Sequence, residues 1–331
     1  MMTALSWRRY LMLFQLLFIW SLPNPAVSQD RTVRLTGTIS EERISPLMAA
    51  LANRVRGVEL SYVRRSSAQI AAYAQRADVP FDIALLSSPD IAISIANEGF
   101  AVSDEISGSM ATTHWRQEIF SFWSDPAVMV LREAAFPDRL PRTRIELVRA
   151  LEQGGPRFLR RVGIVNVGID DVSYVLAAQD SIRTSLYWRL MRAFGSAKAR
   201  IYDTTDDLLS AFSRGEVDVL YNVPLSALHA VNRSEVGGQV VVPQDYVLSV
   251  PWTVLMTKGA ANKRDARILL HVLNSLEIKP ALSTAGFGYP ADFPASSSFQ
   301  RIELGPELLV FRDTIKRSKF LDIWFQMVVD Q

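Results

Sequence analysis

Two runs of sequence in the second half of the chain decide the fold: residues 215–230, GEVDVLYNVPLSALHA, and residues 245–276, DYVLSVPWTVLMTKGAANKRDARILLHVLNSL. In the first run, the apolar residues from Val217 to Tyr221 predict a short strand, and Pro224 stops the turn that follows it. Tyr221 and Asn222 are therefore expected where this strand ends, at the edge of a sheet where polar side chains can meet a ligand.

The second run predicts a strand, a turn and a long helix in direct succession. Thr253 to Met256 form the strand, a Lys-Gly pair forms the turn, and Asn262 is the expected N-cap of the helix. The helix has an apolar stripe at helical spacing, made by Ala266, Leu269, Leu270 and Leu273. A strand that leads through a tight turn into such a helix is typical of an α/β sheet.

In their order, these runs resemble the type 2 periplasmic solute-binding proteins of ABC transporters, in which the chain crosses back between two lobes just before such a helix. Further matching stretches are FDIALLSSPDIAISIANEGFA (residues 81–101), WRQEIFSFWSDPAVMVL (115–131) and SYVLAAQDS (173–181). Residues 87–101 and 304–324 are most similar to the iron(III)-binding and phosphoglycerate-regulatory branch of that family.

The resemblance implies an α/β fold of two lobes, each a mostly parallel sheet flanked by helices, joined by two crossover segments that form a hinge. It places the first lobe at residues 29–125 and 252–331, with a C-terminal helix, and the second lobe at residues 126–251. The alternation of strands and helices from residue 32 onward agrees with a mostly parallel sheet. About 300 residues after the N-terminal segment also exceed what one compact core usually holds.

Three further predictions concern the first crossover segment and the C-terminal segment of the chain. The Ser124-Asp125-Pro126 run is expected to interrupt a strand-rich passage from Trp115 to Leu131. Leu308 to Phe311 reads as an apolar strand, and Thr314 to Val328 as an amphipathic helix that attaches to one lobe or reaches the other.

The N-terminus predicts export. Arg8 and Arg9 precede an apolar run from Leu11 to Trp20 and a small-residue site at 26–28, so residues 1–28 are expected to be a signal peptide and the mature protein periplasmic. A membrane anchor is the alternative, but the unbroken apolar run is shorter than the roughly 20 residues that span a bilayer. The chain contains no cysteine, which excludes disulfides, thiolate metal sites and a cysteine nucleophile.

The charge balance argues against nucleic-acid binding. The whole chain has 36 basic and 34 acidic residues, and removal of Arg8 and Arg9 with the signal leaves 34 of each sign. A protein with no net charge has no bulk attraction to nucleic acid. Of the other arginines, Arg64, Arg65, Arg183 and Arg189 are expected on solvated helix faces or strand ends.

The candidate ligand site consists of four turns that follow predicted strands, together with the first crossing. Hydroxyls and free backbone N–H groups at such turns can bind an oxyanion or a carboxylate. The predicted ligand-binding residues are Thr38, Ser40, Ser87, Ser88, Trp123, Asp125, Ser173, Tyr174, Tyr221 and Asn222. For each hydroxyl the alternative is a plain helix cap, and for Trp123 it is packing at the hinge.

Two features bear on the identity of the ligand. Asp170 and Asp171 stand where relatives commonly have a Ser-Gly pair, and they would repel an anion unless they point away or hold a cation. The arrangement favoured over cation binding is that one aspartate caps its helix and the other is solvated. Ferric-binding relatives use adjacent tyrosines, whereas Tyr221 is followed here by Asn222 and the three histidines show no metal-ligand spacing. The pattern disfavours ferric binding without excluding it, and no metal or cofactor is predicted.

The predicted function is capture of a small molecule or ion between the lobes and its delivery to an ABC permease. The same fold can instead present its ligand to a membrane sensor kinase, and a periplasmic hydrolase is a weaker alternative. Nucleophile-elbow, zinc-protease, phosphate-loop and dinucleotide motifs are all missing from the sequence, so we expect a protein that is not an enzyme. We expect it to be a monomer.

Overall fold

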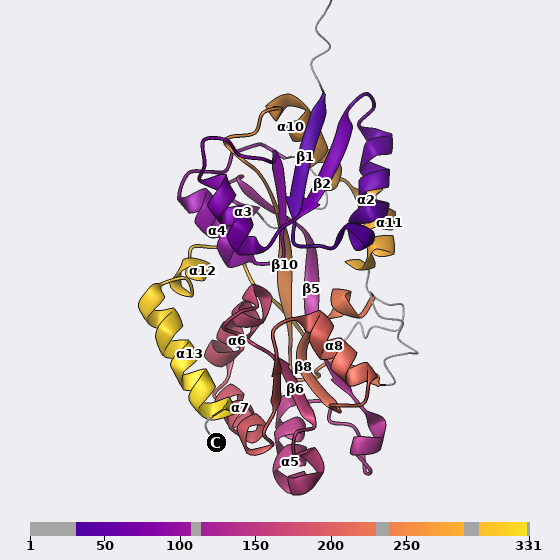
Figure 1. Cartoon of the computed structure of the whole chain (residues 1–331), viewed down its shortest axis with the longest axis vertical. Coiled ribbons are helices and arrows are strands. Elements are labelled where there is room, and N and C mark those ends of the chain that lie inside the picture. The colour runs from indigo at the N-terminus through magenta and orange to yellow at the C-terminus, as the bar shows by residue number, and fades with distance from the viewer. Residues whose placement is uncertain (1–30, 107–113, 230–237, 288–297, 330–331) are drawn as a thin grey trace, which may run out of the picture. The chain divides into compact units, whose positions relative to one another are not determined.

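The computed structural model describes residues 31–106, 114–229, 238–287 and 298–329 (Figure 1). Thr32–Gln331 form one unit, and the description below concerns the described residues of that unit. The predicted signal peptide, residues 1–28, lies outside the described residues. Among those described, no helix has both the length and the apolar character that crossing a membrane requires.

The first half of the sheet consists of three parallel strands, each followed by a helix. The strands lie in the order β2 (Glu59–Arg64), β1 (Thr32–Gly37) and β3 (Ile83–Leu86). The helices that follow β1, β2 and β3 are α2 (Glu41–Arg54), α3 (Ser67–Ala74) and α4 (Pro89–Asn97). This regular alternation puts the carboxyl ends of the strands and the N-termini of the helices at the same edge.

The second half of the sheet repeats this arrangement. Its parallel strands are β8 (Val219–Pro224), β6 (Val162–Val165) and β7 (Arg200–Tyr202), in that order. Its helices are α5 (Arg144–Gly154), α6 (Asp171–Arg183), α7 (Leu186–Ser196) and α8 (Thr205–Ser213). The fold is therefore the predicted α/β fold with two lobes, each built on a mostly parallel sheet.

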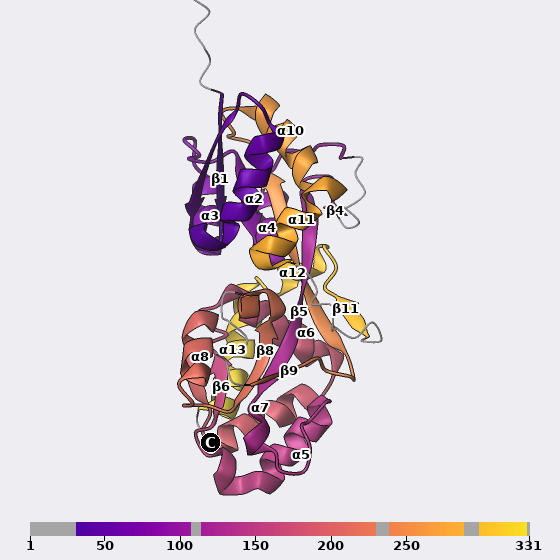
Figure 2. The same ribbon diagram turned by 90° about the vertical axis from the view of Figure 1, so that its right-hand side faces the viewer.

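Two long antiparallel strands, β5 (Ile119–Leu131) and β10 (Val247–Met256), lie between the halves in the strand order (Figures 1 and 2). β10 also pairs with β3, and the end of β5 pairs with β8. These strands are the two crossover segments of the predicted fold. The predicted lobe boundaries, 125/126 and 251/252, fall inside these two strands.

The expected interruption at Ser124-Asp125-Pro126 is wrong, because β5 runs through it. Pro126 pairs with Ser249 of β10, and the next residue, Ala127, pairs with Pro224 of β8. β5 thus changes its partner at Pro126. A proline has no N–H to donate, and such a residue is tolerated in a strand where the hydrogen-bond ladder is discontinuous.

Smaller elements complete the fold. Short strands β4 (His114–Trp115) and β9 (Gln239–Val241) pair with β5, and β11 (Phe299–Arg301) pairs with β10. The remaining helices are α10 (Lys263–Leu273), α11 (Lys279–Leu282), α12 (Glu307–Val310) and α13 (Thr314–Val328). Single helical turns occur at Glu133–Ala135, Gly155–Phe158, Leu225–His229, Leu276–Ile278 and Ser283–Phe287.

Each half has its own apolar core. In the first half, the stripe of α10 packs with Leu47 and Leu51 of α2. In the second half, Leu147 of α5 and Leu190 of α7 pack with Val162 of β6. Asn262 caps α10 as predicted, since its side chain accepts a hydrogen bond of 3.2 Å from the backbone N–H of Asp265.

The C-terminal segment contacts both halves. The predicted strand from Leu308 to Phe311 is wrong, since α12 (Glu307–Val310) occupies that stretch and packs on α4. α13 has the predicted bounds and packs on α7 of the second half, where Trp324 is buried (Figure 1). A short apolar run does not distinguish strand from helix by its pattern alone, which explains the error.

Asp90, the second residue of α4, is the buried partner of this tail. Its carboxylate lies 3.4 Å from Nη1 of Arg312, and its other oxygen is buried without a hydrogen-bond partner among the described residues. Burial raises the pKa of Asp90 to about 6, against the opposing effect of Arg312. The folded protein therefore holds a proton on Asp90 in a pH range where the unfolded chain has lost it.

We predict that Asp90→Asn weakens the pH dependence of stability. In the wild type, the free energy of unfolding should rise as the pH falls from about 6 toward 4, because the folded state binds the additional proton. A pKa difference of about two units corresponds to roughly 2 to 3 kcal/mol, which the asparagine variant should lose. Urea unfolding at pH 4.5, 6 and 7.5 measures this, with exposed Asp322→Asn as the control. A variant whose pH profile matches the wild type would contradict the prediction.

Candidate functional site

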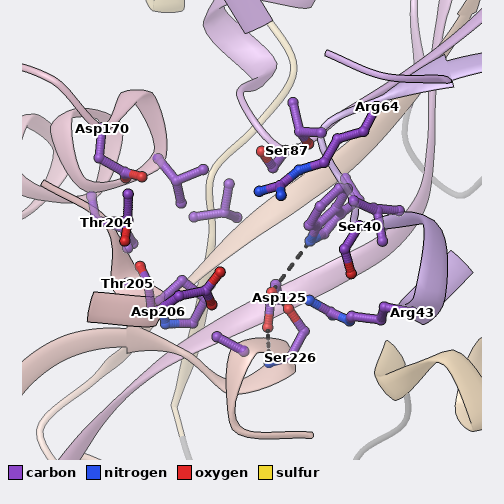
Figure 3. A pocket seen from close by; sticks show the side chains of 18 residues that line it. Ser40, Arg43, Arg64, Ser87, Asp125, Asp170, Thr204, Thr205, Asp206 and Ser226 are labelled. Atoms are coloured by element: carbon purple, nitrogen blue, oxygen red, sulfur yellow. Dashed lines mark hydrogen bonds between the residues drawn. The ribbon is translucent and has the colours of Figure 1, made fainter. Parts of the chain in front are cut away.

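A cavity of about 250 Å³ lies where both halves of the sheet present the ends of their strands (Figure 3). Its volume is close to the lower end of the roughly 300 to 1,000 Å³ of ordinary ligand pockets, which suits a small solute. The polar and charged residues of the lining are Thr38, Ser40, Arg43, Arg64, Ser87, Asp125, Asp170, Thr204, Thr205, Asp206 and Ser226. Apolar contact area comes from Ile39, Val172, Leu176, Pro224, Ala227, Val250 and Trp252.

The hydroxyls on the first-half wall follow the ends of β1 and β3. Thr38 comes directly after β1 and Ser87 directly after β3, and their hydroxyl oxygens lie 3.0 Å apart. Gly37 makes this close approach possible: a Cβ at that position would lie 2.8 Å from the carbonyl oxygen of Leu85 and 2.8 Å from Oη of Tyr62. The adjacent strand ends therefore bring two hydroxyls to one place in the cavity.

The helix N-termini at the cavity differ between the two walls. Ser40 and Ser88 are the N-caps of α2 and α4, and neither side chain makes a capping hydrogen bond. On the opposite wall, Asp170 caps α6 by accepting 2.7 Å from the N–H of Ser173, and Thr204 caps α8. The first-half helices thus leave N–H groups that a ligand oxygen can use, whereas the second-half helices are satisfied by their own side chains.

Arg43, in the first turn of α2, is held from one side only. Its Nε donates 3.1 Å to the carbonyl oxygen of Ala285, and its guanidinium lies 4.9 Å from the centre of the Phe287 ring. Its Nη2 is buried and has no hydrogen-bond partner among the described residues. Burial lowers the pKa of Arg43, while the charges of Asp125 and Asp206 raise it. An arginine stays charged under all these influences, so Nη2 is a buried cationic donor at the cavity.

Arg64 is the last residue of β2, and its guanidinium also points into the cavity (Figure 3). In the part of the chain that the structure describes, it makes no side-chain hydrogen bond and no ion pair. Arg64 is exposed at the end of a strand, as expected, but its position outside the candidate site is corrected because it lines the cavity. A long side chain at the carboxyl end of a parallel strand reaches the crevice where ligands bind.

Asp125 lies at the bottom of the cavity and joins three segments of chain. Its carboxylate accepts hydrogen bonds from the N–H of Ser226 at 3.0 Å, from the hydroxyl of Ser226, and from Nε1 of Trp252 at 3.2 Å (Figure 3). Burial raises its pKa against the effect of these donors. Asp125 thereby connects β5, β10 and the turn after β8 at the place where the strands cross.

Of the predicted ligand-binding residues, the structure brings Thr38, Ser40, Ser87 and Asp125 together in the cavity lining. Ser88 is fully buried behind them, and its Oγ accepts a hydrogen bond of 3.4 Å from the hydroxyl of Ser67. Trp123 is half-buried and packs against the core between α2 and α10, which is the packing alternative considered above.

The other predicted residues lie elsewhere. Ser173, Tyr221 and Asn222 line a separate cavity of about 30 Å³ in the second half, next to Trp324 of α13. Tyr174 points toward the tail, where its hydroxyl donates 2.7 Å to the carbonyl oxygen of Phe311. The structure thus moves these four positions out of the candidate ligand cavity.

The placement of Tyr221 is corrected because β8 extends to Pro224, so that Tyr221 and Asn222 lie within the strand. The Tyr221 hydroxyl donates to the carboxylate of Asp180 and accepts 2.6 Å from Nε of Arg144. Asn222 has a φ of 55°, in the left-handed region, and its Nδ2 lies 3.3 Å from Asp180. Asparagine tolerates this backbone conformation better than other non-glycine residues.

Sequence reasoning missed Arg43, Arg64, Thr204, Thr205, Asp206 and Ser226 as lining residues. Thr204 is the N-cap of α8 and Asp206 lies in its first turn, so the signal that could have found them is a helix start, because helix starts face the crevice. Asp170 caps α6 as expected, while Asp171 is half-buried near Arg312 and Arg317. Among the described residues, no group of three or more histidine or acidic side chains could hold a metal ion.

Comparison with known proteins identifies the family. Residues 41–288 match the family model of bacterial extracellular solute-binding proteins. The chain belongs to this family. No curated protein sequence matches it.

Several solved structures share the fold of this chain. The substrate-binding protein of an ABC transporter from Agrobacterium tumefaciens is 20% identical, with a TM-score of 0.80 over 92% of this chain and 96% of that one. Iron-bound HitA from Pseudomonas aeruginosa is 15% identical, with a TM-score of 0.68 over 89% and 99%. AfuA from Actinobacillus pleuropneumoniae, solved with exogenous fructose-6-phosphate bound, is 10% identical, with a TM-score of 0.67 over 90% and 98%.

Proposed function

We propose that this solute-binding protein captures a small solute in the cavity between the two halves of its sheet and delivers it to an ABC permease. The observation that carries the proposal is the composition of the cavity wall. Thr38, Arg43 and Ser87 come from the first half, and Asp170 and Asp206 from the second. A solute that contacts both walls stabilises a closed arrangement over an open one by its differential affinity for the two.

β5 and β10 are the proposed hinge. They are the crossover strands, and Asp125 of β5 binds both Trp252 of β10 and Ser226 after β8. Hinge motions are absorbed by a few residues at such crossings while the packed halves move as rigid bodies. A permease that recognises only the closed form would then respond to loaded protein, and we place this exchange in the periplasm, with the protein as a monomer.

Binding without chemistry is the proposed activity. Of the described residues that line the cavity, Ser40, Ser87 and Ser226 could in principle be nucleophiles. The described lining contains no histidine or lysine that could take the proton of such a serine. Delivery to a permease also agrees with the Agrobacterium tumefaciens structure, whose description is the substrate-binding protein of an ABC transporter.

Native mass spectrometry tests the capture step. We expect freshly purified protein to show a mass increment of one small molecule, which denaturation releases for identification. The released solute should raise the melting temperature of protein that has been unfolded and refolded without it. Protein that retains nothing, and that no member of a broad panel of metabolites and ions stabilises, would overturn the proposal.

Uptake of that solute separates delivery from signalling. Cells that lack this gene should lose high-affinity uptake of the identified solute, and the gene in trans should restore it. Unchanged uptake, together with loss of a transcriptional response to the solute, would replace the permease with a membrane sensor kinase.

A further inference from the structure

The two walls of the cavity have opposite charge. Arg43 and Arg64 extend into it from the first half, and Asp170 and Asp206 face them from the second half (Figure 3). A purely anionic solute would lie against the carboxylates, and a purely cationic solute would lie against the guanidinium groups. This polarity therefore restricts which solutes can fill the cavity.

The first-half wall is suited to an oxyanion. Nη2 of Arg43 is buried without a hydrogen-bond partner in the part of the chain that the structure describes, and a buried donor without a partner is destabilising. The Arg64 side chain has no hydrogen-bond or ion-pair partner among the described residues. The hydroxyl of Ser40 makes no capping bond, so both it and the N-terminus of α2 can contribute donors. Two guanidinium groups together with hydroxyls and backbone N–H groups match the geometry of a phosphate or a carboxylate.

The second-half wall is suited to a cation. Asp206, the second residue of α8, is exposed and accepts no hydrogen bond from the residues that the structure describes. Burial raises the pKa of Asp170, and the negative charge of Asp206 adds to that rise. No basic residue from the second half belongs to the described lining. A positive group placed here would reduce the repulsion between the two carboxylates.

The charged side chains of the two cavity walls are not satisfied by ion pairs with each other. Asp125 and, across the cavity, Asp206 both attract Arg43, and both raise its pKa against the lowering effect of burial. Asp125 already accepts hydrogen bonds from Ser226 and Trp252, so Asp206 is the carboxylate that remains unpaired among the described residues. The described residues nevertheless show no ion pair between Arg43 and Asp206 within 4.0 Å. A ligand with one charge of each sign can bridge this separation and satisfy both walls at once.

We propose that the solute is a zwitterion, with an oxyanion held by Arg43 and Arg64 and a protonated amine held by Asp206 beside Asp170. This inference rests on the proposed function, because it specifies the chemical class of the captured solute. A phosphate and a carboxylate are both compatible with the arginine pair, so the test includes one zwitterion of each type.

Isothermal titration of the purified full-length protein, refolded to remove retained solute, compares four probes. Phosphoethanolamine and 4-aminobutanoate are the zwitterions, glycerol 3-phosphate replaces the amine with hydroxyls, and ethanolamine lacks the oxyanion. At least one zwitterion should bind at least tenfold more tightly than both glycerol 3-phosphate and ethanolamine. Which zwitterion binds better identifies the oxyanion. Failure of both zwitterions to bind, or equal binding of glycerol 3-phosphate, overturns the proposal.

Charge-neutralising variants locate the two ends of the ligand. Arg43→Gln and Arg64→Gln should each weaken zwitterion binding roughly 10- to 100-fold, the range expected for loss of a charge-assisted hydrogen bond. Asp206→Asn should weaken zwitterion binding by a similar factor and leave glycerol 3-phosphate binding unchanged or tighter. Arg56→Gln and Asp322→Asn, at exposed positions outside the lining, are the matched controls and should bind as the wild type does.

Circular dichroism melting of every variant shows that the fold is retained. If Asp206→Asn affects both ligands equally, the amine end is misplaced and the proposal fails. The identity of the solute released in native mass spectrometry separates this failure from failure of the proposed function. A retained solute with no amine or no oxyanion refutes the zwitterion alone, whereas a cavity that binds nothing refutes both.

Discussion

Replacing Asp180 with alanine is expected to lower the free energy of unfolding by about 3 to 5 kcal/mol, the range for removing one partner of a buried ion pair. Asp180 and Arg144 are both fully buried, and Nε of Arg144 lies 3.3 Å from the Asp180 carboxylate. The same carboxylate accepts hydrogen bonds from the hydroxyls of Tyr221 and Tyr246. Its removal therefore leaves a buried guanidinium without its main countercharge and two buried hydroxyls without an acceptor.

Urea unfolding measures this loss, and an exposed ion pair supplies the control. Arg189 and Glu152 lie 2.6 Å apart with 49% and 41% of their side chains exposed, so Glu152→Ala should change stability by less than about 1 kcal/mol. In the Asp180 variant, the ion pair between Arg144 and Asp245, at 3.1 Å, remains and reduces the loss of unfolding free energy. Similar small losses in both variants would show that the buried network does not stabilise the second half.

Replacing Trp324 with alanine is the second large effect, with an expected loss of about 3 to 5 kcal/mol. Trp324 is 1% exposed on α13, where it packs among Tyr187, Leu190 and Phe194 of α7 in the core of the second half. Alanine has the highest helix propensity, so α13 itself should persist, and the loss would come from the cavity left behind.

Ile323→Ala is the matched control for Trp324, because Ile323 is the adjacent residue of α13 and is 42% exposed. Its substitution should change stability by less than about 1 kcal/mol. Unfolding in guanidinium chloride, followed by far-UV circular dichroism, compares the two variants. Fluorescence is not suitable, because the Trp324 variant lacks the fluorescence of that residue. Equal losses for the two substitutions would mean that α13 is not docked through Trp324.

Local patterns predicted the mostly parallel sheet, whereas the two lobes and their crossover segments were implied by the resemblance to solute-binding proteins. The alternation of strands and helices predicted the sheet, and Asn262 caps a helix as expected. The strand predicted for Leu308–Phe311 is wrong because four apolar residues fit a strand and a helix equally well. The expected position of Tyr221 is wrong because the pattern predicts a strand that ends at Tyr221 and a turn that Pro224 stops. In the structure β8 continues to Pro224 itself.

The candidate cavity was only partly predictable for a different reason. Hydroxyls after strands, such as Thr38 and Ser87, are found from sequence because helix starts have recognisable residues. Arg43 and Arg64 were missed because a charged side chain is assigned to solvent unless a contact places it elsewhere. The position of Arg43 depends on Ala285 and Phe287, some 240 residues away, and no local pattern records such a contact.

The C-terminal segment gives the molecule a third mechanical connection besides β5 and β10. α12 is attached to α4 in the first half and α13 to α7 in the second, with Phe311 to Asp313 between them. Three connections that are not in one line restrict the directions in which two bodies can rotate. The proposed opening of the two halves would therefore also have to bend the chain near Arg312, a residue outside the cavity lining, so we expect this segment to limit how far the cavity can open.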